Sequence, residues 1–492
     1  MARLLYVLIS LSLFRILPSL RAELTDRQTQ ALEGMARDRY STRWDLLSTN
    51  ELAALRKKVE LYQAELRTNH LVGGLVVSLR YTDTNRTQVT KYEATEDSGA
   101  WTGFYLAGLA TRYAVERKPS ILGEVREVLS GVERLLNASG RLGYLARFAA
   151  PERDPAYKAT YATFGGADPQ RPGFGRLAFP GTNGLVWLGG PSRDNYAGLN
   201  LGLALTHRFV RESGIRQRVS NVMDHLLTRL DTDGWRLNDG QGNVEYLDPL
   251  LSVALLRTGA STSGRSWGGR YEQQARLYAN QHRTDSPRPL VPAFDDLRPA
   301  LFAAADLMSL SLLETNKTRQ LLYLDQLTKL WRSAGPELNP WLAVAYVGAF
   351  DLSPNDSSAQ AILQGVLAQY PAPPRWAWSR AQPTNLVGGL VEANGRTWCK
   401  DALPFPRRPV SAFQWAQAGR TWMAEDLIEP VVHPGVDLIT AYWLARNASF
   451  VWPEDLQPVT TKSSSRESTP KRSGASANLG TNTVPKTPAP PR

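Results

Sequence analysis

Along most of the chain, apolar residues recur every three or four positions, which is the spacing that places them on one face of a helix. The stretch over 98–116 is an example, because Leu106, Leu109 and Tyr113 fall on a single face. Asp97, directly before that face, is a suitable cap residue. The same pattern predicts helices over 24–65, 98–116, 120–138, 194–212, 214–231, 247–258, 268–281, 297–314, 318–334, 338–350, 356–369 and 437–447.

Two short segments alternate between apolar and polar residues instead, which is the pattern of half-buried strands. They are LVVSLRYTD, residues 75–83, and QVTKYEAT, residues 88–95, and a turn at Asp83 to Asn85 connects them. We therefore expect a small β-hairpin within an otherwise helical N-terminal segment over 23–93.

An internal repeat organises the helices that follow. With a shift of 95 residues and no gap, 101–143 lies over 196–238, and Gly103 matches Gly198. Each copy is a helix hairpin with a glycine-bearing turn, which is the unit expected of a helical repeat array. The second copy is delayed by an insertion over 150–192, rich in Gly, Pro, Arg and aromatic residues. We predict that this insertion is a structureless loop that forms a wall or lid over a site.

Four segments carry a resemblance to a known family. They are DSGAWTGFYLAGLATRYA, GRLGYLAR, SRDNYAGLNLGLAL and PGVDLITAYWLARNASF, which begin at residues 97, 140, 192 and 434. The chain resembles the six-hairpin glycosidase-like superfamily, which includes secreted glycosidases, unsaturated-glycan hydrolases and polysaccharide lyases, and within it an exported bacterial branch. The resemblance implies an all-α fold, in which an (α/α)6 toroid of helix hairpins spans 94–456 and acids just before its inner helices line a funnel.

The two ends of the sequence differ from this body. Residues 1–22, MARLLYVLISLSLFRILPSLRA, have a basic start, an apolar run and a polar end, which is the layout of a secretory signal. Residues 457–492 are rich in Ser, Thr, Pro and Lys, so we expect a disordered tail. We expect a secreted or periplasmic protein, without an integral membrane segment after signal cleavage; an uncleaved signal anchor is the alternative.

The formal net charge of +11 comes mainly from these two ends. The signal holds three arginines, and residues 458–492 hold six basic residues and one acid, which leaves +3 for the rest. So small an excess does not indicate a nucleic-acid partner.

The single cysteine, Cys399, excludes an intramolecular disulfide, and the five histidines lack the spacing of metal ligands. We therefore expect a monomer that needs no metal or other cofactor.

Acids at helix starts are the candidate catalytic residues. Glycoside hydrolysis requires one protonated carboxyl group to protonate the leaving oxygen and one ionised carboxylate to activate water or attack the sugar. We assign these roles to Asp97 and Asp194, which occupy similar positions in the two repeats. The alternative is that each acid only caps its helix.

Polar and aromatic residues near these acids are the candidate ligands of a carbohydrate substrate. The segment SRDNYAG, residues 192–198, supplies a cation, an acid, an amide and a ring, although a cap with a structural ion pair would also explain it. Tryptophan rings could stack on sugar faces, although most aromatic residues pack in cores. The candidate substrate-binding residues are Glu96, Trp101, Arg147, Trp187, Arg193, Asn195, Tyr196, Trp415 and Asp437.

Three functions are compatible with these residues. The first is an exported glycoside hydrolase that uses Asp97 and Asp194. The second is a polysaccharide lyase acting on uronic polymers, with Arg193 or Asn195 to neutralise a carboxylate and Tyr196 or His207 as the base. The third is a non-catalytic envelope or glycan-binding protein, which would retain the aromatic residues but not a convergent acid pair.

Overall fold

The computed structural model describes residues 46–164, 178–238, 244–263, 267–284, 297–334, 339–350, 357–379, 390–393, 396–399, 410, 413 and 427–448. The predicted signal at 1–22, the first part of the predicted helix over 24–65, the predicted tail over 457–492 and Trp415 lie outside the described residues.

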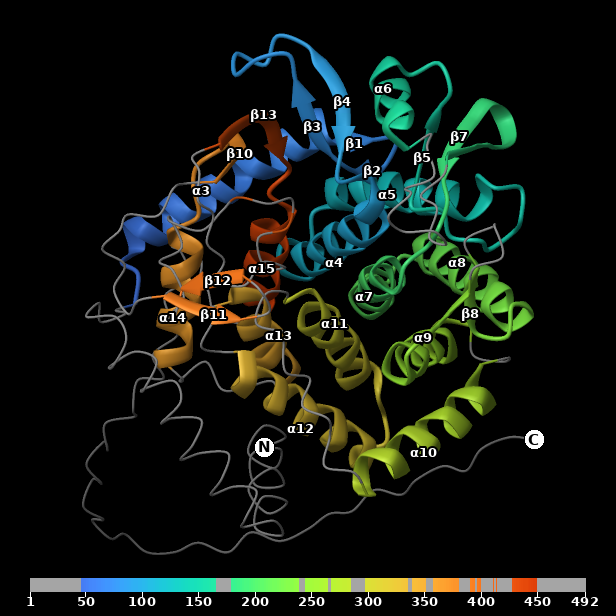
Figure 1. Ribbon diagram of the computed structural model, residues 1–492. Coiled ribbons are helices and arrows are strands. Elements are labelled where there is room, and N and C mark those ends of the chain that lie inside the picture. The colour runs from blue at the N-terminus through green and yellow to red at the C-terminus, as the bar shows by residue number, and fades with distance from the viewer. Residues whose placement is uncertain are drawn as a thin grey trace, which may run out of the picture. The chain divides into compact units, whose positions relative to one another are not determined.

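Helices dominate the fold and follow the predicted pattern closely (Figure 1). The helices that the sequence predicted are α3 (Thr49–Glu65), α4 (Ser98–Glu116), α5 (Pro119–Asn137), α7 (Arg193–Phe209), α8 (Ser213–Thr232), α9 (Pro249–Thr262), α10 (Gly268–Thr284), α11 (Arg298–Leu313), α12 (Lys317–Ala334), α13 (Pro340–Phe350), α14 (Ser357–Ala368) and α15 (Val436–Asn447). Within the described part of the chain, none of the helices is long and apolar enough to span a membrane.

Local sequence signals set several helix starts. The hydroxyl of Ser48 accepts a hydrogen bond from the amide of Glu51, and the Glu51 carboxylate accepts one from the amide of Ser48, so α3 begins with a capping box. Before α9, the carboxylate of Asp248 accepts a hydrogen bond from the amide of Leu251, and a proline occupies the first helical position.

Six of the helices, which we call the core helices, are α4, α7, α9, α11, α13 and α15. Helix α4 packs against α7 and α15; α7 also contacts α9 and α11; α11 contacts α9 and α13; and α13 contacts α15. In α4, every residue from Ser98 to Thr111 is buried, as expected for a helix with apolar residues all around it. The flanking helices α3, α5, α8, α10, α12 and α14 each pack on one or two core helices.

Helices α4 and α7 approach each other through glycine. A Cβ atom on Gly103 would lie 2.2 Å from the carbonyl oxygen of Gly198, and one on Gly202 would lie 2.4 Å from that of Gly103. Farther toward the helix starts, Gly99 lies beside Asn195. Because contacts advance in the same direction along both helices, α4 and α7 are parallel and begin at the same end.

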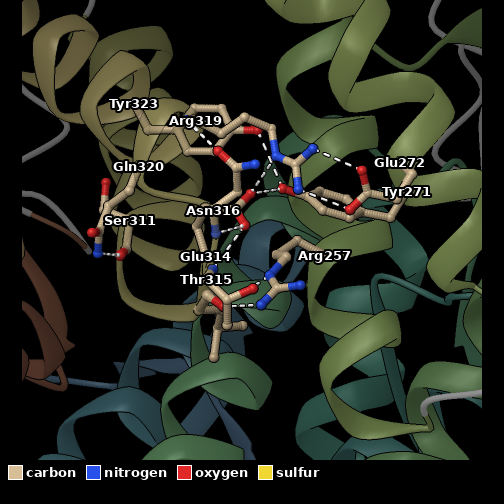
Figure 2. Close-up of polar contacts among 11 residues, drawn as sticks. Arg257, Tyr271, Glu272, Ser311, Glu314, Thr315, Asn316, Arg319, Gln320 and Tyr323 are labelled. Carbon is tan, nitrogen blue, oxygen red and sulfur yellow. Dashed lines mark hydrogen bonds and ion pairs between the residues drawn. The ribbon is translucent and has the colours of Figure 1, made fainter.

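A network of polar contacts joins the C-terminal halves of the core helices α9 and α11 to the flanking helices α10 and α12 (Figure 2). We call it the Glu314 cluster. The buried carboxylate of Glu314, directly after α11, accepts hydrogen bonds from Tyr271 and from the Arg319 guanidinium at 2.9 Å. Arg319 also forms two hydrogen bonds of 2.8 Å with Glu272, and Arg257 donates to the backbone carbonyl of Leu313 at 2.9 Å.

Electrostatics in the Glu314 cluster favour the ionised carboxylate. Burial would raise the pKa of Glu314, but hydrogen bonds from Arg319 and Tyr271 outweigh it and hold that pKa below its ordinary value. The cations of Arg257 and Arg319 each lie 5.2 Å from the ring centre of Tyr271. The cluster therefore ties four helices together at one end.

The predicted β-hairpin is present and belongs to a larger sheet. Strands β3 (Ser78–Tyr81) and β4 (Val89–Glu93) pair antiparallel, and the sheet order is β10-β13-β3-β4, with β10 at Arg375–Ser379 and β13 at Leu427–His433. Strand β4 is at the edge. The hydroxyl of Thr160 accepts a hydrogen bond from the Tyr92 amide and donates one to the Tyr92 carbonyl, so a side chain occupies backbone groups that an edge strand would otherwise expose.

The prediction of a structureless insertion over 150–192 is wrong for its described residues. Strands β5 (Phe148–Pro151), β7 (Leu185–Leu188) and β6 (Ala178–Pro180) form an antiparallel sheet in the order β5-β7-β6, and α6 (Pro155–Phe164) packs on β4. The apolar run LVWL forms β7, which pairs with both neighbours and so satisfies its backbone groups.

Among the described residues, three short antiparallel ladders lie outside these two sheets. They are β1 (Leu71–Val72) with β2 (Leu75–Val76), β8 (Arg236–Asn238) with β9 (Val244–Tyr246), and β11 (Leu390–Ala393) with β12 (Arg396–Cys399).

Candidate functional site

The starts of α4 and α7 bring the two predicted catalytic acids to the same end of the core helices. Strand β4 leads through Ala94, which has a left-handed backbone with φ of 55°, into a short 3-10 helix, Thr95–Asp97. Asp97 occupies the N-cap position of α4, yet among the described residues its carboxylate accepts no capping hydrogen bond. The carboxylate instead lies 3.7 Å from the guanidinium of Arg147.

Arg147 lies directly before β5 and points toward the start of α4. Its Nε donates a hydrogen bond to the carbonyl of Gly190, and its Nη1 donates one of 2.8 Å to the carbonyl of Glu96. The side chain is 9% exposed. Arg147 is therefore a buried cation held by backbone carbonyls and by the Asp97 carboxylate.

Asn195, in the first turn of α7, holds the same carbonyl from the other side. Its Nδ2 donates to the carbonyl of Glu96 at 3.0 Å and to the hydroxyl of Ser192 at 2.8 Å. Ser192 is the N-cap residue of α7, but among the described residues its hydroxyl caps no backbone amide. The carbonyl of Glu96 is thus the point where the starts of α4 and α7 meet.

The partly buried Asp194 has an unusual titration. Burial and, to a smaller extent, the negative charge of Asp97 together raise the pKa of its carboxyl to about 6. The positive charges of Arg298, Arg147 and Arg193 oppose the rise. A carboxyl group with a pKa near 6 can hold and release a proton close to neutral pH, which is what a general acid requires.

Asp437, at the start of α15, lies in a different environment. Its fully buried carboxylate pairs with Arg375 at 2.7 Å and accepts a hydrogen bond from the Tyr370 hydroxyl. A buried carboxylate with a close cation is a frequent structural arrangement. The structure therefore gives the Asp437 carboxylate a buried cationic partner of its own.

The predicted stacking residues are packed among other side chains. Trp101 is 4% exposed, and its ring stacks on Phe413 at 4.7 Å and on Phe302 at 6.1 Å between ring centres. Trp187 is also buried, and its Nε1 donates to the carbonyl of Pro180 at 3.2 Å. In this conformation both indole rings contribute to packing.

The two candidate bases of the lyase alternative are also far from ideal for that role. Burial raises the pKa of Tyr196 above its ordinary range. His207 lies in the last turn of α7, about 20 Å along the helix from Asp194 by the rise per residue. Burial and the nearby Arg216 lower the pKa of His207 to about 4.

Two further arginines contribute positive charge near Asp194. Arg193 is exposed in the first turn of α7, where it can meet solvent and solutes. Arg298, in the first turn of α11, was not predicted from the sequence, although its charge acts on Asp194. No local signal marks Arg298, because it reaches the site only through the packing of α11 on α7.

A cavity of about 610 Å³ is lined by residues other than the acid pair. Leu79, Val89 and Tyr92 line it from β3 and β4, and Arg153 and Asp154 line it from the segment before α6. Neither Asp97 nor Asp194 contributes to its lining. Tyr92 donates a hydrogen bond of 2.8 Å to Asp154 across it.

Among the described residues, no group of three or more His, Cys, Asp or Glu side chains is placed to hold a metal ion. Comparison of the chain with protein-family models and with curated proteins finds no match.

Proposed function

We propose that this protein is an exported glycan-active enzyme, a glycoside hydrolase in which Asp194 is the proton donor and Asp97 is the ionised partner. The observation that carries the proposal is the convergence of Asp97 and Asp194 at the common start of α4 and α7, where burial and the charge of Asp97 raise the pKa of Asp194 to about 6. Pairs of carboxyl groups whose environments give them different affinities for protons are typical of glycosidase sites.

The proposed reaction uses each group once in the bond-breaking step. Asp194 donates its proton to the glycosidic oxygen as the bond between that oxygen and the anomeric carbon breaks. Asp97 either removes a proton from the water that attacks this carbon or attacks the carbon itself, and the second route then needs water to release the sugar. Both routes consume one water for each bond cleaved.

We also propose that the core helices form the inner ring of an (α/α)6 toroid of the six-hairpin glycosidase-like type. The contacts support this arrangement, because they run from α4 through α7, α9, α11, α13 and α15 back to α4. Each core helix also has a flanking helix packed on it. In such a ring the common starts of the parallel helices would surround the acid pair.

The hydrolase is better supported than the two alternatives. A lyase needs a base near the sugar carbon that loses its proton, whereas Tyr196 is buried and His207 lies at the far end of α7. A binding protein would present aromatic rings to a glycan, whereas Trp101 and Trp187 are buried. The expectation of a secreted or periplasmic location continues to rest on residues 1–22.

A panel of soluble glycans, incubated with the purified protein and assayed for new reducing ends, tests the proposal. We expect Asp194→Asn and Asp97→Asn to fold normally and to lose on the order of 10² to 10⁴-fold in turnover. The control is Asp325→Asn in α12, an acid paired with Lys329. Full activity in Asp194→Asn, or ultraviolet-absorbing unsaturated products, would contradict a hydrolase with this acid pair.

A further inference from the structure

We propose that Arg147 is a positioning residue for the acid pair. Its side chain holds the start of α4 against the root of the 150–192 insertion and does not bind an anionic group of the substrate. This inference rests on the proposed function for its catalytic meaning, but the contacts that carry it are independent of any substrate.

The first argument is where the guanidinium of Arg147 is directed. Its Nε and Nη1 donate to the carbonyls of Gly190 and Glu96, and Nη1 lies 3.7 Å from the carboxylate of Asp97. A buried cation is stable only when nearby carbonyls and a counter-charge replace its hydration. A substrate carboxylate that took this guanidinium would have to displace those contacts. Arg193, by contrast, is exposed to solvent.

The second argument is the place of Arg147 in the chain. Its amide donates to the carbonyl of Leu188 at 2.9 Å, and the next residue, Phe148, pairs with Leu188 in the sheet. The two ends of the insertion therefore lie side by side at Phe148 and Leu188, which form its root. The side chain of Arg147 then crosses from this root to the start of α4.

The third argument is that two elements hold the carbonyl of Glu96. Arg147, at the root of the insertion, donates to it over 2.8 Å, and Asn195, in α7, donates to it over 3.0 Å. This carbonyl belongs to the peptide that leads directly into Asp97, so its position sets where the Asp97 carboxylate lies relative to Asp194. A displacement of about 1 Å in such a group is enough to reduce turnover by on the order of 10²-fold.

The test compares Arg147→Met and Arg147→Lys with Arg193→Met. Arg193→Met is the control for loss of charge alone: the cation that it removes also opposes the raised pKa of Asp194, so the midpoint should rise, but amide exchange over residues 95–98 should not change. Carboxyl carbon NMR of the free protein measures the titration of Asp194. Since the charge of Arg147 opposes the raised pKa of Asp194, we expect the midpoint to move upward in Arg147→Met. Amide exchange over residues 95–98 should accelerate in the same variant. Arg147→Lys, which keeps the charge but not the fork of donors, should keep the midpoint and still exchange faster.

Substrate binding is tested separately with glucuronate as the probe. We expect the Nε resonance of Arg147 to be unchanged by glucuronate in the native protein. On any glycan that the enzyme cleaves, Arg147→Lys should lower kcat on the order of 10²-fold with little change in KM.

Two results would overturn the inference: a glucuronate-dependent shift at Arg147, or unchanged titration and exchange in a folded Arg147→Met. If Arg147→Met does not fold, the exchange measurement on Arg147→Lys decides alone. A protein that cleaves no glycan but shows the expected titration and exchange would refute the proposed function and leave the positioning contacts established.

Discussion

The side-chain amide of Asn195 donates a hydrogen bond to the backbone carbonyl of Glu96 over 3.0 Å, although the two residues are 99 positions apart. This contact joins the starts of two parallel core helices. Because Asp97 follows Glu96 and Asp194 precedes Asn195, it also holds the two acids at one end of the fold.

We expect Asn195→Ala to destabilise the protein by about 1 to 3 kcal/mol, because the change removes a buried hydrogen bond and leaves the Glu96 carbonyl with one donor fewer. Urea unfolding gives the difference. The control is Asn221→Ala in α8, whose side chain makes an exposed hydrogen bond with Gln217 and should matter little. Equal effects of the two substitutions would contradict the role given to Asn195.

The raised pKa of Asp194 predicts a pH-dependent penalty on stability. The folded protein binds this proton up to about pH 6, whereas the unfolded chain releases it near pH 4, so stability decreases as the pH rises between these values. Asp194→Asn removes the effect. We expect the variant to gain roughly 1 to 3 kcal/mol relative to the native protein between pH 4 and pH 7, measured by urea unfolding at several pH values. A constant difference over this range would contradict the raised pKa.

The same titration predicts the pH dependence of catalysis. A general acid is active only while protonated, so kcat/KM should decrease as the pH rises through about 6. Initial rates on an active glycan across pH 4.5 to 8, a range of about 1.5 units or more on each side of that midpoint, measure this limb. In Arg298→Met, which removes a cation that opposes the rise, the midpoint should move upward. A midpoint that does not move would show that the limb belongs to another group.

The contact between α4 and α7 predicts a large difference between two glycine substitutions. Gly103→Ala would place a methyl group 2.2 Å from the Gly198 carbonyl, and we expect a loss of about 3 kcal/mol or more as the helices separate. In α5, a methyl group on Gly123 would meet no described atom within 4 Å beyond its own helix, so Gly123→Ala should stabilise the protein by about 0.5 to 1 kcal/mol. Thermal and urea unfolding compare the two.

The buried ion pair between Arg375 and Asp437 predicts that removing one partner destabilises the protein more than removing both. Arg375→Met leaves the Asp437 carboxylate buried without its cation, and we expect a loss of about 3 to 5 kcal/mol. Arg375→Met combined with Asp437→Leu should recover much of this loss, because the uncompensated charge is then absent. A double variant that is no more stable than Arg375→Met would show that the pair contributes through geometry rather than charge.

Local pattern was sufficient to predict the described α-helices other than α6. Helix α4 could be placed at residues 98–116 because the spacing of its apolar residues, which is visible in the sequence, is what allows the helix to be buried. The insertion was harder, because β5 and β7 acquire their hydrogen bonds from each other across the intervening chain and neither is distinctive alone.

The candidate site shows the same limit. The sequence singled out Asp97 and Asp194 by their matching places in the repeat, but it could not tell a residue that meets substrate from one that meets protein. Asp437 finds its cation 62 positions away in Arg375, and Trp101 has its ring covered by Phe413. Such partners are set by tertiary packing, for which a single sequence carries no local signal.

The Glu314 cluster makes one end of the core helices mechanically stiff. It lies about 24 Å along α11 from Arg298, by the rise per residue, and so at the end away from the acid pair. Charged hydrogen bonds there join α9, α10, α11 and α12, and breaking them would strand a buried carboxylate. A motion that separates these four helices is therefore strongly disfavoured at this end of the core.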